Sequence, residues 1–293
     1  MLRREFVVRE AKASDKDAVL RFCQHTFAWG DYIQNVWDFW VSNLSGKIFV
    51  ATFENVPVGM SHVEIVKRGE AWLEGARVAP EFRRMGVAST LNKACLDWAV
   101  GRDAKIARLA TDSSNLAAQK ALAKLEFKQV SDWAIMEFDG CYLDTGANTR
   151  FAEASDFDAV WKFLKNSENF VASAGLFTVV FRWMSLDRVK LRRFIKRRMA
   201  IVHERGKVVD GLVLFDDTAK YAWHENIMQT CYVDGDFEAV LSMGRFLKRH
   251  LYDEGVAGIH GDLCNCAPLV SAFAELGFKA HDNTEFVYEK KLS

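Results

Sequence analysis

The sequence predicts an α/β protein built from two tandem folds, each with a mixed, mostly antiparallel sheet flanked by helices. Its 293 residues suit two domains of roughly 100 to 200 residues each. A ten-residue segment occurs twice, as A-S-D-K-D-A-V-L-R-F at residues 13–22 and as A-S-D-F-D-A-V-W-K-F at residues 154–163, with seven identical positions. Two further similar segments begin at Asn115 and Asn265, near the end of each half.

The elements of the first copy follow from hydrophobic spacing and turn residues. Apolar residues three and four apart after Ser14 and Asp15 indicate a capped amphipathic helix. The expected elements are strands at 6–10, 47–53, 58–67, 71–78, 105–111 and 127–139 and helices at 14–27, 32–44, 86–101 and 115–125. Strands that alternate with helices predict a sheet with helices on its faces. Turn-forming residues at 141–148 mark a boundary, so we expect domains at 1–143 and 147–293.

Composition and charge exclude several classes of partner. Lys+Arg and Asp+Glu both total 39, so the chain has no excess of positive charge. Because affinity for phosphates needs clustered positive charge, we expect no nucleic-acid partner. The longest stretch without a charged residue is 13 residues, at 169–181, whereas a membrane helix needs about 20 apolar residues, so we expect no membrane partner. The charged N-terminus does not resemble a signal peptide, and six scattered cysteines fit reduced thiols, so we expect a cytoplasmic protein.

One stretch, at residues 71–95, has the pattern of an anion site. A strand ending at Val78 is followed by a turn and then by R-R-M-G-V-A, which opens a helix. Helix-start N–H groups and the positive end of the helix dipole favour a bound phosphate. Gly86 lets the backbone approach a ligand closely, while Arg83 and Arg84 add charge-assisted contacts.

This stretch resembles the pyrophosphate loop of the GNAT family of N-acetyltransferases, Q/R-x-x-G-x-G/A after a strand often ending in V-x-P. The resemblance covers residues 5–139 and includes R-V-A-P-E-F-R-R-M-G-V-A, Asn115 and the later L-E-F. It implies two GNAT-like folds, acetyl-CoA as co-substrate and acetyl transfer to an amine. The coenzyme residues that it implies are Ala76, Arg77 and Val78 on the strand, Arg83, Arg84, Met85, Gly86, Val87, Ala88 and Ser89 in the loop, and Asn115.

The resemblance also implies catalytic positions. A backbone N–H of the strand ending at Val78 would face the thioester oxygen, as in an oxyanion hole. Glu74 is our candidate general base, because strand alternation places it on one face with Trp72, Ala76 and Val78; the alternative is a solvated strand glutamate. His62 and Glu64, on the preceding strand, are weaker candidates for the base.

The motif departs from the family at its end. The tyrosine that often acts as general acid is replaced by Leu122, and the glycine of the terminal motif by Glu126. A thiol with a pKa near 8.5 is a tolerable leaving group without that acid.

The second copy lacks the anion loop. Asp234, Asp236 and Glu238 stand where the first copy has its proline and arginines, and carboxylates repel a pyrophosphate. We therefore predict a degenerate domain, structural or shaping the acceptor pocket. Its basic run at 188–198 is either a solvated helix face or a site for acidic partners or coenzyme phosphates. Cys264-x-Cys266 has no second ligand pair, so we predict no metal.

The acceptor is predicted to be a small-molecule amine. Trp29, Asp31 and Tyr32 lie between the first two helices, where aromatic rings and a carboxylate could enclose a cationic amine. The alternative is core packing. This segment together with L-E-G-A-R-V-A-P is similar to histidine N-acetyltransferase-like proteins, which implies an amino-acid α-amine. A protein N-acetyltransferase and a non-catalytic acyl-CoA sensor are the alternatives. We expect the two copies to form an intramolecular pseudo-dimer and leave a homodimer open.

Overall fold

The computed structural model describes residues 5–24, 26, 30–140, 146–216 and 227–292. Contacts divide these residues into two units. Unit 1 takes the described residues of Met1–Leu109 with Ala117–Lys128 and Tyr288–Ser293, and unit 2 takes Ala110–Leu116 and Gln129–Val287. The units therefore do not follow a single cut near residues 143–147. The strand that ends the first half belongs to unit 2, whereas the chain's last residues belong to unit 1.

Unit 1 contains a mixed sheet with the strand order β1-β2-β3-β4-β5-β15. Neighbours from β1 to β4 are antiparallel, and β4 pairs with β5 in parallel. The strands are β1 (Val7–Glu10), β2 (Gly46–Phe53), β3 (Val56–Lys67), β4 (Glu70–Val78), β5 (Ile106–Asp112) and β15 (Glu285–Lys291), and the helices are α1 (Lys16–Cys23), α2 (Ile33–Ser42), α3 (Val87–Val100) and α4 (Leu116–Lys124). The element types and order expected for the first copy are confirmed.

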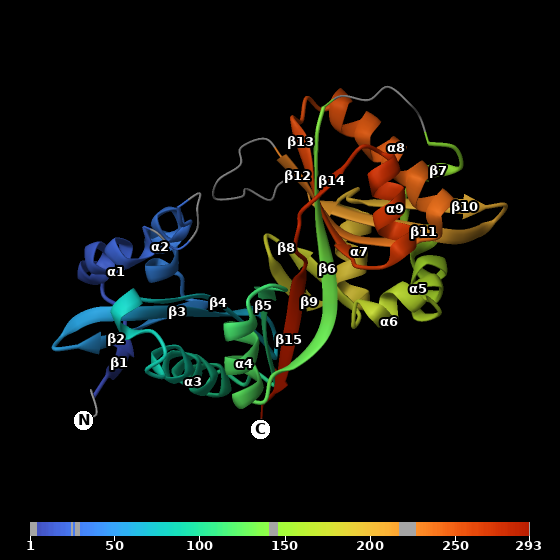
Figure 1. Ribbon diagram of the computed structural model, residues 1–293. Coiled ribbons are helices and arrows are strands. Elements are labelled where there is room, and N and C mark those ends of the chain that lie inside the picture. Colours follow the sequence, from blue (N-terminus) through green and yellow to red (C-terminus); the bar gives the residue numbers. More distant parts are fainter. Residues whose placement is uncertain (1–4, 25, 27–29, 141–145, 217–226, 293) are drawn as a thin grey trace. The chain divides into compact units, whose positions relative to one another are not determined.

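Helices cover both faces of the unit 1 sheet, with α1 and α2 on one side and α3 on the other (Figure 1). The buried side chains separate into two sets accordingly. The set under α1 and α2 is Val19, Cys23, Ile33, Trp37, Trp40, Ile48, Val50 and Met60. The set under α3 is Ala51, Val58, Ala79, Val87 and Leu91. Burial of these apolar faces is the main favourable term that fixes the helices on the sheet.

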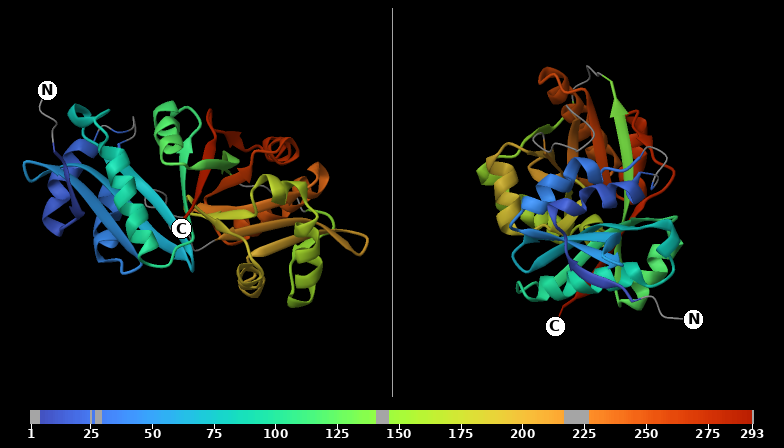
Figure 2. Two further views of the ribbon diagram at one scale, coloured as in Figure 1. Left: turned by 90° about the horizontal axis from the view of Figure 1, so that it is seen from below. Right: turned by 90° about the vertical axis from the view of Figure 1, so that its left-hand side faces the viewer.

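Unit 2 repeats the arrangement, with the strand order β7-β10-β11-β12-β13-β6 and again one parallel pair, β12 with β13. Its strands are β7 (Thr149–Phe151), β10 (Ala200–Arg205), β11 (Val208–Asp216), β12 (Ile227–Gly235), β13 (Gly258–Cys264), β6 (Lys128–Asp139), β14 (Lys279–Ala280) and the separate hairpin β8 (Leu176–Val179) and β9 (Arg182–Ser185). Its helices are α5 (Phe157–Lys165), α6 (Glu168–Ala172), α7 (Arg188–Lys196), α8 (Phe237–Asp253) and α9 (Ala267–Glu275), seen from two further directions in Figure 2.

The repeated A-S-D segment forms the same hydrogen-bonded corner in both units. Asp15 accepts two hydrogen bonds from Arg9 and one from the backbone of Lys12. Asp156 accepts from Arg150 and from the backbone of Glu153 in the same way. The arginine hydrogen bonds lower the pKa of both carboxyl groups. The identity of the two segments thus reflects one structural task, joining the first strand of each copy to its first helix.

No helix in the described part of the chain is both long and apolar enough to cross a membrane.

A half-buried carboxyl group, Glu285 at the start of β15, makes the stability of the fold depend on pH. Burial, followed by the charges of Asp112 and Asp262, raises the pKa of Glu285 to about 8. The folded state therefore keeps this proton up to about pH 8, whereas the unfolded state releases it near its ordinary pKa of 4.5. The stabilising contribution is complete below that ordinary pKa and is lost as the pH rises through 8.

We expect Glu285→Gln to remove this dependence. As the pH rises from about 5 to 8, the unfolding free energy of the parent should fall relative to that of the variant by about a few kcal/mol. Urea titrations across that range measure the difference. A difference that stays constant with pH would contradict a proton held by Glu285.

Candidate active site

The turn between β4 and α3 presents a row of backbone N–H groups. Pro80 begins a short 3-10 turn, and Gly86 then caps α3 with a left-handed φ of 86°. The first helical hydrogen bond comes from Thr90 to the carbonyl of Gly86. Within the described chain, the N–H groups of residues 84–89 have no protein acceptor. Such open N–H groups at a helix start are suited to a bound anion.

The side chains of this turn leave the N–H groups accessible. Arg83, Arg84 and Met85 are exposed, and Arg83 Nε donates to the Val78 carbonyl at 3.2 Å. A Cβ built on Gly86 would meet no atom within 4 Å. The turn is therefore an open row of backbone N–H groups flanked by two exposed arginines, Arg83 and Arg84.

The corresponding turn of unit 2 is closed by its own carboxylate. Asp236 caps α8, and its side chain accepts from the Ala239 N–H at 2.9 Å and from Arg205 at 2.8 Å. Asp234 is buried and accepts hydrogen bonds from Ser167, Asn169 and Tyr232. A diphosphate at this helix start would have to displace a carboxylate of the chain and would meet its charge.

Strand β4 carries a bulge that changes which side chains share a face. Glu74 pairs with His62 and Arg77 pairs with Met60, so two residues of β4 lie opposite one residue of β3 between these pairs. Gly75, at a φ of 68°, sits in this bulge. The expected face of Trp72, Glu74, Ala76 and Val78 is therefore wrong beyond Glu74. Because cross-strand partners point to the same side, Glu74 shares its face with Arg77, below α1 and α2.

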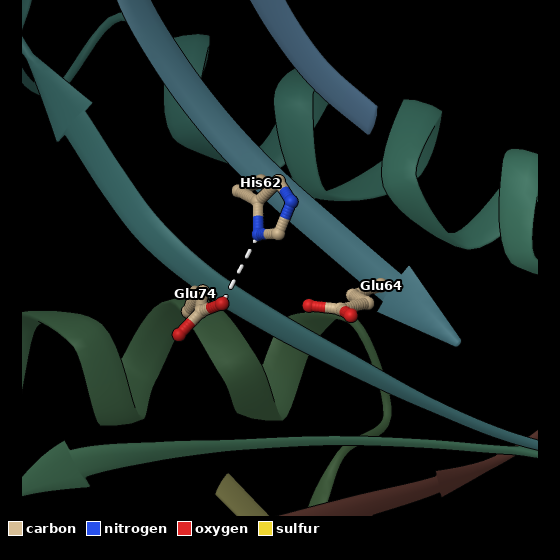
Figure 3. A group of neighbouring side chains, drawn as sticks. All are labelled: His62, Glu64 and Glu74. Atoms are coloured by element: carbon tan, nitrogen blue, oxygen red, sulfur yellow. Dashed lines mark hydrogen bonds and ion pairs between the residues drawn. The ribbon is translucent and has the colours of Figure 1, made fainter. Parts of the chain in front are cut away.

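Glu74 and His62 form a hydrogen-bonded pair on this face. His62 Nδ1 lies 3.1 Å from Glu74 Oε1, and the imidazole stacks on Trp40 with ring centroids 4.1 Å apart and planes 3° apart. The His62 side chain is fully buried, whereas Glu74 is 14% exposed. Figure 3 shows Glu64 pointing toward the same two groups. The stack fixes the ring, so Nδ1–H can hold the Glu74 carboxylate in one orientation.

Asp31 and Arg77 meet in a buried ion pair. Arg77 Nε donates to Asp31 Oδ2 at 2.7 Å, and the two side chains are only 12% and 3% exposed. Burial opposes the Arg77 charge, but the Asp31 hydrogen bond and the neighbouring charges together outweigh burial and raise the pKa of Arg77. The guanidinium also lies 5.4 Å from the Tyr32 ring centroid. The Asp31 charge, expected to attract a substrate cation, is thus already balanced within the chain.

We expect Asp31→Asn to destabilise the protein strongly, because it leaves the buried Arg77 guanidinium without its counter-charge. Breaking a buried ion pair from one side costs about 3–5 kcal/mol of unfolding free energy. Urea denaturation measures this, with Asp17→Asn on the exposed side of α1 as the control. A loss under about 1 kcal/mol would mean that solvent reaches the pair.

Two further predicted site residues, Trp29 and Asn115, are not placed at the site. Trp29 lies outside the described residues. Asn115 is exposed and belongs to unit 2, so its place beside the coenzyme loop stays a prediction. Leu122 is 3% exposed in the core and offers no proton. Glu126 has a φ of 63°, the conformation that a glycine adopts easily at this position.

At the place that matches His62 and Glu74, the described residues of unit 2 include no acid–imidazole pair. Its sheet has a bulge at Cys231, and the residues paired just before it are Phe215 and Thr230. These occupy the positions that His62 and Glu74 occupy beside the bulge of β4. The second unit therefore has neither an open helix start nor a base at the matching place.

Three features of the site were missed from the sequence. The bulge had a signal, because an isolated glycine within a strand pattern, here Gly75, indicates one. The Trp40 stack and the Asp31–Arg77 pair join residues distant in the chain, and no local pattern marks such contacts.

The comparisons with known proteins agree with this geometry. A model of the Acetyltransferase (GNAT) family matches residues 18–127. Histidine N-acetyltransferase of Oreochromis niloticus is 28% identical over 105 residues, which cover 35% of this chain and 31% of that protein. The chain thus matches about a third of that relative's length.

Solved structures share the fold over both copies. A GCN5-related N-acetyltransferase from Sphaerobacter thermophilus is 12% identical with a TM-score of 0.63, covering 98% of this chain and 95% of that one. A tandem GNAT protein from the clavulanic acid biosynthesis pathway is also 12% identical, with a TM-score of 0.55 and 98% coverage of both chains. Residues 18–127 thus match the model of the acetyltransferase (GNAT) family, and the solved structures share the fold of both copies.

Proposed function

We propose that the chain is an acetyl-CoA-dependent N-acetyltransferase that acetylates the amine of a small molecule or amino acid. The observation that carries the proposal is the row of N–H groups at residues 84–89, open beside a strand that also holds Glu74. Bound acetyl-CoA would supply the acetyl thioester. Residues 84–89 would hold its diphosphate through backbone N–H groups, and β4 would bind its pantetheine arm.

Glu74 takes the proton of the attacking amine in this proposal. Its carboxylate is partly exposed, which leaves room for water or amine, and His62 Nδ1–H holds its orientation. The amine nitrogen forms a bond to the thioester carbon, a backbone N–H near Val78 stabilises the oxyanion, and the carbon–sulfur bond breaks. The amine proton passes to Glu74. The thiolate takes a proton from solvent, because Leu122 cannot supply one.

The acceptor class is supported by two arguments. Glu64 and Glu74 make the face below α1 and α2 acidic, which favours a cationic amine over an anionic one. The similarity to histidine N-acetyltransferase supports the α-amine of an amino acid. Protein N-terminal acetylation is the second enzymatic candidate, and an acyl-CoA sensor is the non-catalytic one.

The second unit is proposed to be structural, since its helix start is closed by Asp236. Cytoplasmic location stays a prediction, in keeping with the free thiols of the five described cysteines. An amine library assayed for thiol release from acetyl-CoA tests the proposed activity. We expect release with one class of small amines. Tight coenzyme binding without release for any amine or peptide would favour the sensor, and release with peptide N-termini alone would favour protein acetylation.

A further inference from the structure

His62, Glu64 and Glu74 bring three metal-ligating atoms together on the face below α1 and α2. One imidazole nitrogen and one oxygen of each carboxylate all lie within 4.8 Å of one another. Figure 3 shows that both carboxylates point to the same side of the imidazole. His62 and Glu64 alternate along β3, and Glu74 lies across from His62 on β4. The register of β3 and β4 therefore fixes the backbone positions of all three residues.

The spacing suits a small transition-metal ion. Zinc ligands at about 2.0–2.2 Å in a tetrahedron lie about 3.3–3.6 Å from one another. The observed Nδ1–Oε1 distance is 3.1 Å and the upper limit for the three atoms is 4.8 Å, so small side-chain rotations would close the site. Imidazole and carboxylate are both ligand types that zinc and related ions accept, and three protein ligands leave a fourth position open.

The surroundings of His62 are consistent with a ligand role. Its side chain is fully buried and its ring is held against Trp40, so it can adopt few orientations. Within the described chain, Nε2 is buried without a hydrogen-bond partner. Binding of an ion at Nδ1 replaces the hydrogen bond to Glu74 and leaves the single ring proton on Nε2. Nε2 has no partner among the described residues with or without an ion at Nδ1, so the spacing of the three ligand atoms and the fixed ring carry the case for the site.

We propose that His62, Glu64 and Glu74 form a binding site for Zn²⁺ or a similar divalent transition-metal ion, and that the ion reversibly inhibits the enzyme. An ion bound at Glu74 occupies the carboxylate that would accept the amine proton, and it repels a cationic acceptor. The inhibition rests on the proposed function, whereas the binding does not. The same three side chains would thus make acetyl transfer sensitive to free zinc.

The binding is tested on the full chain without coenzyme. One equivalent of Co²⁺ should bind to the Cys266→Ser protein. The absorption spectrum of the bound ion should show d–d bands and no thiolate charge-transfer band. The Cys266 substitution removes half of a competing pair, because Cys264 and Cys266 have sulfur atoms 3.5 Å apart. Glu64→Gln and Glu74→Gln should each weaken Co²⁺ and Zn²⁺ binding at least about tenfold, since each removes a ligand charge. Glu54→Gln, an exposed change in the β2–β3 turn, should bind as the parent does.

Equal metal affinity of the parent, Glu64→Gln and Glu74→Gln would overturn the site, as would a spectrum of thiolate ligation. His62→Gln is a third variant, but its buried stack makes misfolding a risk, and the two isosteric glutamate changes keep the test decisive. In the activity arm, Zn²⁺ should inhibit the parent and a chelator should restore turnover. Metal binding without any turnover refutes the proposed function alone. Turnover that Zn²⁺ leaves unchanged refutes the inhibition alone.

Discussion

Gly86→Val is expected to weaken acetyl-CoA binding at least about tenfold. Gly86 has a φ of 86°, and a β-branched residue in this left-handed region costs roughly 1–2 kcal/mol or more. The chain can relieve that strain only by rotating the peptide units on either side. This rotation turns N–H groups of residues 84–89 away from a common centre. Isothermal titration with acetyl-CoA measures the loss, and 1.4 kcal/mol corresponds to tenfold in affinity.

Gly206→Val is the matched control for this variant. Gly206 has a φ of 71° in the β10–β11 turn, and a Cβ there also meets no atom within 4 Å. Both variants should lose a similar unfolding free energy, but Gly206→Val should keep the parent's coenzyme affinity. Equal affinity of Gly86→Val and the parent would mean that the diphosphate binds elsewhere.

Glu74→Gln is expected to lower kcat about a hundredfold or more, the usual contribution of a general base. The amide keeps the size of the side chain and can still contact His62, so the fold and the coenzyme affinity should stay unchanged. Steady-state kinetics with the best amine of the library measure the loss.

Glu81→Gln, an exposed change in the turn after β4, serves as the control and should leave kcat unaltered. An unchanged kcat in Glu74→Gln would contradict the assignment of the base. If Glu64→Gln instead showed the hundredfold loss, the general base would be Glu64 on β3.

Local patterns predicted most of the fold. Apolar spacing and turn residues predicted the elements of the first copy, and the repeated A-S-D segment predicted a second copy of the fold. Local patterns could not predict which segments of the chain belong to each unit. Nearly all of the strand Lys128–Asp139 belongs to unit 2, where it pairs with β13, and the chain's last residues belong to unit 1. Such long-range pairing leaves no periodic signal in a single sequence.

The site was predicted unevenly for a related reason. The coenzyme turn is contiguous, so its glycine and arginines were visible together in the sequence. The bulge at Gly75 shifts the alternation by one residue, and a one-residue shift moves every later side chain to the other face. Asp31 and Arg77 are 46 residues apart, and only the folded sheet shows that they neutralise each other.

Hydrogen exchange with and without acetyl-CoA tests the central claim most directly. The N–H groups of residues 84–89 are open in the structure, so bound diphosphate should slow their exchange strongly, with one equivalent bound per chain. The matching helix start at residues 236–241 is capped by Asp236 and should exchange as before. Protection at 236–241, or saturating coenzyme without protection at 84–89, would contradict a diphosphate cradle in the first copy.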